Sequence, residues 1–193
     1  MTCLEWAQSS GNVAIVFRLG NIVGTGARGL IEYLVRHAVR YPDGSHPARI
    51  RGNGRVVRDY VPVAHLIALI CASLEQEWEP GRAHVVNVGS GIGLTNGEVG
   101  RAVSDLLRPQ GYTLHIECDA GLTAAEPMVS VLNVADTTRR LGIPPPALDA
   151  VWKGIEETVL DSLRRTSQQA QAPERPCSSP RDPLPLARQD SAS

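Results

Sequence analysis

The sequence predicts one α/β domain over residues 1–165 and a disordered tail over residues 166–193. Short β-branched segments alternate with amphipathic helical segments along the first part of the chain, as in a partly parallel sheet covered by helices. The composition, 42% hydrophobic and 20% charged residues, is that of a folded globular protein. From Ser167 onward Ser, Pro, Gln, Ala and Arg dominate, and this segment offers almost nothing to bury.

The first half of the chain predicts a buried strand and then a helix. Residues 13–17 are an unbroken apolar run rich in β-branched side chains, typical of a strand buried on both faces of a parallel sheet. Such a strand needs a neighbour on each side, and an unpaired edge would recruit other chains. Residues 30–41 carry Leu30, Leu34 and Ala38 at helical spacing before the Pro42-Asp43-Gly44 stop. Short strands at 48–51 and 56–63, separated by a Gly-Asn-Gly turn, and a helix at 64–77 follow.

The second half repeats this alternation. Residues 84–88 are a strand, and Thr95 with Glu98 forms the capping-box pattern that begins a helix ending near Leu107. Residues 113–117 alternate like a strand, and a helix at 134–141 stops at Gly142 and Pro144. The last helix is expected at 148–163 because apolar residues form one stripe: Val151, Ile155, Val159 and Leu163.

Charge and composition argue against several classes of protein. Nineteen basic and twenty acidic residues give a net charge of -1, so a nucleic-acid partner is not expected. No apolar segment is long enough to cross a bilayer and no signal-peptide pattern begins the chain, which favours a cytoplasmic protein without membrane contact. The four cysteines lack the spacing of a zinc or redox site, and no metal site is expected.

Two polar motifs follow or border predicted strands. Arg18-Leu-Gly-Asn21 comes directly after the buried strand, and ligands of open α/β sheets bind at the carboxyl ends of strands. Arg58-Asp59-Tyr60 places a guanidinium, which suits phosphate oxygens, beside an apolar strand. Two plainer interpretations stay open: Asn21 shapes a turn, and Arg58 forms a surface ion pair with Asp59.

Two further motifs, Asn87-Val-Gly-Ser-Gly91 and Leu141-Gly-Ile-Pro144, complete an ordered set of four. Over about residues 1–163 the chain therefore resembles the C-terminal portion of extended short-chain dehydrogenases, the NAD-dependent epimerase/dehydratase family of UDP-galactose 4-epimerase and dTDP-glucose 4,6-dehydratase. The resemblance implies a Rossmann-like fold with its small substrate-binding subdomain. It also implies NAD as cofactor and a nucleotide-diphosphate sugar as ligand.

The resemblance assigns roles to six positions. Asn21 takes the place of the family's phosphate-binding asparagine, and Arg58 that of the arginine that grips the pyrophosphate. Ile50 lies in the strand whose backbone receives the nucleobase, and Leu30 begins the helix that closes over the nucleotide. Leu19 and Gly20 correspond to the backbone stretch beside the nicotinamide of the cofactor.

The departures from the family concern catalysis. Neither the family's glycine-rich dinucleotide turn nor its Tyr-x-x-x-Lys pair occurs in the sequence, and Met1 stands where the lysine would precede Glu5. No catalytic residue is therefore assigned. Gly89-Ser-Gly91-Ile-Gly93 lacks the G-x-G-x-x-G spacing and indicates a helix-entry turn instead. Residues 122–126 lack the family's second phosphate arginine, and His65 replaces an aspartate.

Three hypotheses follow. The chain is the nucleotide-sugar-binding portion of an epimerase or dehydratase, inactive alone and dependent on a complementing N-terminal chain. Alternatively it is a non-catalytic module that binds a nucleotide diphosphate, or an inert truncated gene product. Its open strand edge also predicts self-association, as a homo-oligomer or as an aggregate.

Overall fold

The structure is a computed structural model that describes residues 1–121 and 127–171. Within them the helices are α1 (Cys3–Ser10), α2 (Leu30–Arg40), α3 (Val63–Glu75), α4 (Asn96–Leu107), α5 (Ala135–Leu141) and α6 (Leu148–Gln171), with short 3-10 turns η1 (Gly52–Gly54) and η2 (Arg108–Gln110). The strands are β1 (Ala14–Leu19), β2 (Asn21–Val23), β3 (Ala48–Ile50), β4 (Val57–Pro62), β5 (Ala83–Val88), β6 (Gly93–Thr95), β7 (Ile116–Cys118) and β8 (Val129–Ser130).

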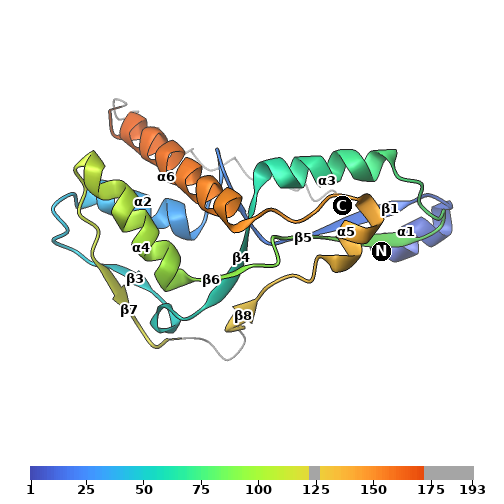
Figure 1. The fold of residues 1–193 in the computed structure, drawn as a ribbon, viewed down its shortest axis with the longest axis horizontal. Helices are drawn as coiled ribbons and strands as arrows, with labels where there is room; N and C mark the ends of the chain where they lie inside the picture. Colours follow the sequence, from blue (N-terminus) through green and yellow to red (C-terminus); the bar gives the residue numbers. More distant parts are fainter. Residues whose placement is uncertain (122–126, 172–193) are drawn as a thin grey trace, which may run out of the picture.

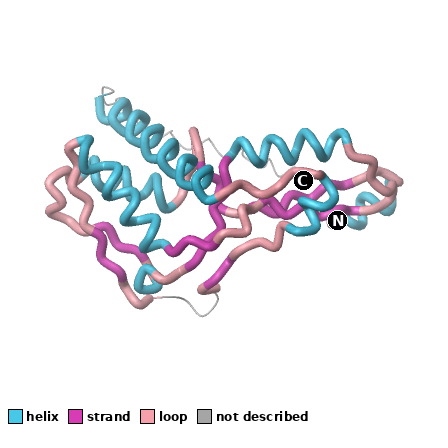
Figure 2. Tube along the Cα trace, viewed as in Figure 1, coloured by secondary structure: helices cyan, strands magenta, loops and turns pink. Residues whose placement is uncertain are grey.

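The molecule is elongated, with helices α2, α4 and α6 at one end and α1, α3 and α5 at the other (Figure 1). Strand β4 runs between these two groups of helices, whereas β3 and β7 lie at the end of α2 and α4, and β1 and β5 lie at the end of α1, α3 and α5 (Figure 2). Strand pairing is mostly parallel: β1 with β5, β2 with β4, β3 with β7 and β4 with β8, while β4 and β6 are antiparallel. The predicted α/β class is confirmed.

Two hydrophobic cores lie on opposite faces of the β2–β4 pair. The larger core joins α2, α4 and α6 and includes Val23 and Tyr60, whereas the smaller one includes Val61 and is packed by Ile22. Because side chains alternate along a strand, Asn21 and Val23 face the first core and Ile22 faces the second. The β2–β4 pair is therefore a partition between the two ends of the molecule.

The expectation for the first strand is only partly met. β1 forms where predicted, but its residues are half-buried or exposed rather than buried on both faces. Among the described strands, β5 is its sole partner, so its other edge carries no ladder hydrogen bonds. An apolar strand is buried on both faces only when neighbouring strands and helices cover it. Among the described residues β1 has a strand on one side only, so it is less buried than its sequence suggests.

The two strands on either side of the Gly-Asn-Gly turn pair with different partners: β3 pairs with β7, and β4 pairs with β2, β6 and β8. One helix differs from the expectation at its end. α6 continues to Gln171, beyond its expected end and into the segment assigned to the tail. The Asp161–Arg165 pair and the bond from Thr166 Oγ1 to the Ser162 carbonyl, each one turn apart, support this extension. Residues 172–193 lie outside the described part of the chain.

Candidate ligand pocket at the β2–β4 edge

Gly20 lies between β1 and β2, at the point where the chain stops pairing with β5 and begins to pair with β4. Its N–H donates to the Val88 carbonyl at 2.8 Å, and the next residue, Asn21, begins β2. A Cβ at Gly20 would lie 3.0 Å from the backbone oxygen of Asp59, a contact tighter than almost all real ones. A glycine here lets the two strands approach closely and sets the register in which Asn21 meets β4.

This register places three polar side chains on one face. Asn21 pairs with Tyr60 in the parallel β2–β4 ladder, and Arg58 precedes Tyr60 by two residues on β4. Residues two apart on a strand point to the same face, as do paired residues on adjacent strands. Asn21, Tyr60 and Arg58 therefore share the face that turns toward α2 and α6.

A pocket of about 270 Å³ opens on this face. The residues around it come from the end of β1, from β2, from β4 and from the start of α2: Gly20, Asn21, Ile22, Val23, Ala27, Arg28, Gly29, Leu30, Ile31 and Tyr60. Three of the six predicted positions, Gly20, Asn21 and Leu30, are among them.

Tyr60, one of the residues that line the pocket, has a buried hydroxyl without a hydrogen-bond partner among the described residues. Its side chain is only 3% exposed, and its hydroxyl makes no hydrogen bond to any residue in the described part of the chain. Burial raises the pKa of Tyr60, while the nearby Asn21 carboxamide and the charge of Arg58 oppose the rise; the carboxamide is close, but outside hydrogen-bonding geometry. A buried hydroxyl without a partner carries a desolvation penalty, which a ligand that bonds to it would relieve.

The amino end of α2 forms the opposite wall. Its N-cap, Gly29, has φ 108° and provides no side-chain cap, so the first N–H groups of the helix lack that partner. Uncapped amides and the helix dipole favour an anionic group at this end. A pocket lined by these amides, a carboxamide and an unpartnered hydroxyl can bind an oxyanion such as a phosphate.

Arg58 lies on the same face but outside the lining of this pocket. One guanidinium nitrogen donates to the carbonyls of Val57 and Pro127, both at 2.9 Å. The side chain thus reaches from β4 toward the segment that leads into β8. Residues 122–126, where the sequence lacks the family's second arginine, lie outside the described residues.

Asp59 is a buried structural residue, so the surface-pair interpretation of the Arg-Asp motif is wrong. Its side chain is 2% exposed and accepts from the Ser90 N–H at 2.7 Å, the Ser90 hydroxyl at 2.6 Å, the Gly91 N–H at 3.1 Å and the Leu132 N–H at 3.2 Å. A Cβ at Gly89 would collide with this carboxylate. The Gly89-Ser-Gly91 turn wraps Asp59, while Thr95 and Glu98 form the expected capping box of α4.

The remaining two predicted positions do not reach the pocket. Ile50 is buried in the larger core, and its carbonyl accepts from the Asp119 N–H at 3.0 Å. Leu19 ends β1 with its side chain about half exposed. Sequence reasoning assigned no binding role to Tyr60, Arg28 or Gly29, although the Arg-Asp-Tyr motif and the glycine before Leu30 were the available signals.

Comparison with known proteins shows which family and which solved structures this chain resembles. Residues 1–89 match the NAD dependent epimerase/dehydratase family. The resemblance inferred from the four motifs is confirmed. No curated protein matches the whole-chain sequence with significance.

Solved structures of epimerases and dehydratases share the fold. RMD from Pseudomonas aeruginosa, complexed with NADPH, matches with a TM-score of 0.64 and 22% identity, over 84% of this chain and 52% of that one. UDP-glucose 4-epimerase from Thermotoga maritima, with UDP-glucose, gives 0.62 and 22%, over 79% and 46%. dTDP-glucose 4,6-dehydratase from Bacillus anthracis, with NAD, gives 0.60 and 23%, over 78% and 44%. The chain thus spans about half the length of these structures.

The epimerase/dehydratase family implies a nicotinamide cofactor, but the described residues fit it only in part. Leu19 and Gly20 lie at the carboxyl end of β1, where ligands of parallel sheets bind. The glycine-rich turn after β5 is occupied by the Asp59 carboxylate and does not form a dinucleotide cradle.

No helix of the described residues is long and apolar enough to cross a membrane.

Proposed function

We propose that this chain is the nucleotide-sugar-binding portion of a sugar-nucleotide epimerase or dehydratase. The observation that carries the proposal is one pocket lined by Asn21, by Tyr60, whose buried hydroxyl has no partner in the described residues, and by the uncapped start of α2. These groups are hydrogen-bond donors, the complement of the oxygens of a diphosphate. Epimerases and dehydratases with nucleotide-sugar substrates are among the structural relatives.

In this proposal the chain binds and orients the nucleotide and leaves the reaction to other groups. The Asn21 carboxamide and the Tyr60 hydroxyl donate to phosphate oxygens, and the first amides of α2 add their dipole. Arg58 contributes positive charge on the same face. Binding energy from the nucleotide fixes the sugar at the reaction centre, where a bound NAD would supply hydride-transfer chemistry.

The surface around β1 has the features of an interface with another part of the epimerase/dehydratase fold. β1 has one partner among the described strands, β5, and the helices that contact this strand pair include α1 and α3. Apolar side chains are exposed on β5 and on these two helices: Val85, Leu4, Trp6, Ile67 and Leu74. Leu74 is 79% exposed and Val85 47%. An unpaired parallel strand beside apolar helical residues suits another strand and its covering helix. We assign this surface to the cofactor-binding part of an epimerase/dehydratase, in a longer protein or a separate chain.

A second function rests on the same pocket. A non-catalytic module would bind the nucleotide diphosphate through Asn21, Tyr60 and α2 without any turnover. Adding the cofactor-binding half of a related enzyme discriminates the two: gain of epimerase or dehydratase activity favours the first function, and binding without turnover favours the second. An inert gene product would show neither.

Isothermal titration with UDP-glucose and dTDP-glucose tests the proposal. Wild-type protein is expected to bind at least one of them, and Arg58→Ala to bind more weakly, because the substitution removes a positive charge from the face on which the pocket opens. The matched control is Arg108→Ala, an exposed arginine paired with Asp105 on the surface. Equal affinity of the wild type and Arg58→Ala would remove Arg58 from the site, and no binding of either sugar nucleotide by wild type would contradict the proposed function.

A further inference from the structure

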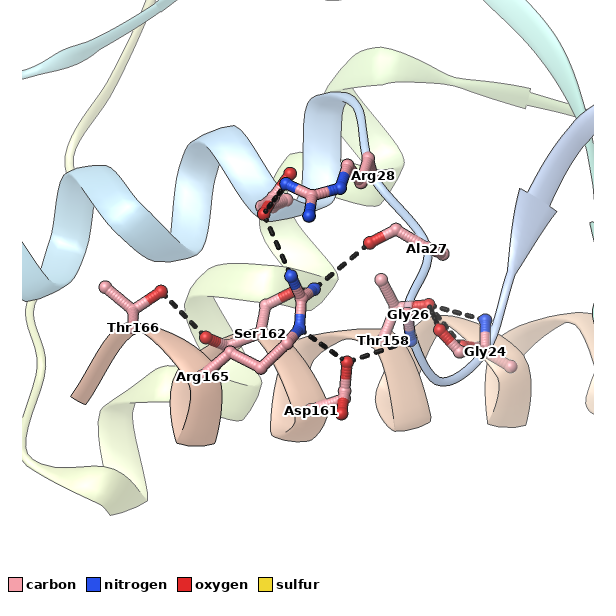
Figure 3. A network of polar contacts seen from close by, with 11 residues as sticks. Gly24, Gly26, Ala27, Arg28, Thr158, Asp161, Ser162, Arg165 and Thr166 are labelled. Atoms are coloured by element: carbon pink, nitrogen blue, oxygen red, sulfur yellow. Dashed lines mark hydrogen bonds and ion pairs between the residues drawn. The ribbon is translucent and has the colours of Figure 1, made fainter. Parts of the chain in front are cut away.

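The loop between β2 and α2 is held by side chains of α6, more than a hundred residues away in sequence (Figure 3). The Gly24 N–H donates to Thr158 Oγ1 at 2.7 Å, and the Gly26 N–H donates to Asp161 Oδ2 at 2.9 Å. Arg165 donates to the Ala27 carbonyl at 3.3 Å. Three consecutive turns of one helix thus bond the backbone of this loop.

The loop needs such support because of its composition. Gly24, Gly26 and Gly29 have φ of 128°, 81° and 108°, a region that glycine enters readily and other residues rarely. A segment with three glycines in six residues has a large conformational entropy to lose when it is ordered. Its own side chains offer little to fix it, so the bonds from α6 select one conformation.

Arg165 also ties the start of α2 to the same helix. Its guanidinium contacts Asp161 at 2.8 Å and Glu32 at 3.1 Å, and all three side chains are largely buried. Glu32 lies in the first turn of α2, whose amides line the pocket. The Asp161–Arg165–Glu32 ion pairs therefore connect both the loop and the amino end of α2 to α6.

We infer that Thr158, Asp161 and Arg165 are positioning residues that hold residues 24–29 and the start of α2 in the conformation that binds the diphosphate. None of the three lines the pocket, so their effect on a ligand passes through the loop backbone. A wall fixed before binding spares the ligand the entropy of ordering it. This inference rests on the proposed function, since it names what prepares that site.

The test combines amide exchange with titration. Thr158→Val removes the hydroxyl that accepts from Gly24, and Arg165→Met removes the guanidinium while keeping the apolar stem. The matched controls lie on the same helix: Thr166→Val, whose hydroxyl bonds to the Ser162 carbonyl within α6, and Lys153→Met, which removes an exposed positive charge. Hydrogen exchange of the Gly24 and Gly26 amides by NMR reports the loop without ligand, and titration with UDP-glucose reports the site.

Thr158→Val and Arg165→Met are expected to speed exchange at Gly24 and Gly26 at least tenfold. They should also weaken UDP-glucose binding five- to tenfold, with the amides of β4 and α4 still protected. The controls should change neither quantity. Arg165→Lys keeps the charge but not the planar fork, so it should recover part of the loss.

Unchanged loop exchange in both variants would overturn the inference, as would faster exchange without any loss of affinity. A failure of the proposed function looks different. Wild-type protein would then bind no UDP-glucose, while exchange at Gly24 and Gly26 would still show whether α6 holds the loop. Arg58→Ala separates the two further, because it should weaken binding and leave loop exchange as in the wild type.

Discussion

Asn21 and Tyr60 occupy paired positions on parallel strands and line one pocket; the Tyr60 side chain is buried, and that of Asn21 is exposed. The pairing depends on Gly20, which lets β2 approach the Asp59 backbone. Below this face Asp59 anchors β4 to the turn after β5. One strand, β4, therefore carries the Asp59 anchor on one face and the pocket residue Tyr60 on the other.

Tyr60→Phe should affect stability and binding in opposite directions. Removing an unsatisfied buried hydroxyl should leave the free energy of unfolding unchanged or raise it by up to about 1 kcal/mol. Loss of a hydrogen bond to the ligand should weaken UDP-sugar binding about five- to tenfold. Urea unfolding and calorimetric titration measure the two quantities. Tyr112→Phe, which lies outside the pocket, is the control, and a Tyr60 variant that loses stability but not affinity would refute the assignment.

Asp59→Asn should destabilise the fold by at least about 2 kcal/mol, because an amide group would face donors that now bond to a carboxylate. The four donors come from Ser90, Gly91 and Leu132. Chemical denaturation of the variant measures the loss. Asp105→Asn removes an exposed ion pair and should stay within about 0.5 kcal/mol of wild type. Equal stability of the two variants would show that Asp59 is not an anchor.

Acid should release the loop from α6. The Gly26 amide, followed by the hydrogen bond and charge of Arg165 and the charge of Arg164, holds the pKa of Asp161 below its ordinary value, against the effect of burial. A lowered folded-state pKa means that this carboxylate stabilises the protein above the unfolded pKa of about 4 and ceases to do so as the pH falls through the folded value. The stability difference between wild type and Asp161→Asn should therefore be constant from pH 5 to 7 and shrink below about pH 4. A difference that grows on acidification would contradict this.

The exposed apolar surface predicts self-association of this chain when it is studied alone. Ile67 and Leu74 are exposed on α3, a helix that contacts β5, and exposed apolar residues associate with other apolar surfaces. Ile67→Lys with Leu74→Lys should lower the weight-average mass in sedimentation velocity. Lysine substitutions at the polar, exposed Gln168 and Gln169 are the control. A monodisperse wild-type monomer would contradict the prediction.

Local chemistry made most elements predictable. Residues close together in the sequence determine several features: the capping box of α4, the end of α2 before Pro42 and the apolar stripe of α6. Helix α1 was missed although Thr2 and Glu5 form a capping box, because its apolar face is short and only Ala7 is buried. Strands β2, β6 and β8 contain two or three residues and depend on pairing with β4, which no local pattern reveals.

Motifs account for part of the candidate pocket. Gly20 and Leu30 border β1 and α2, which the sequence predicts, and Asn21 ends the motif that follows β1. The sequence does not reveal that the Tyr60 hydroxyl is buried without a hydrogen-bond partner in the described part of the chain, because this depends on tertiary packing. The role of α6 was beyond reach because the bonds from Thr158 and Asp161 to the loop span more than a hundred residues.

The central claim is that the pocket binds the diphosphate of a nucleotide sugar. Titration of UDP and uridine into wild type and Asn21→Asp tests it most directly, since the substitution changes one charge with little change of shape. The account predicts that wild type binds UDP far more tightly than uridine, and that Asn21→Asp loses UDP binding through repulsion of like charges. Equal UDP affinity of the two proteins would contradict it.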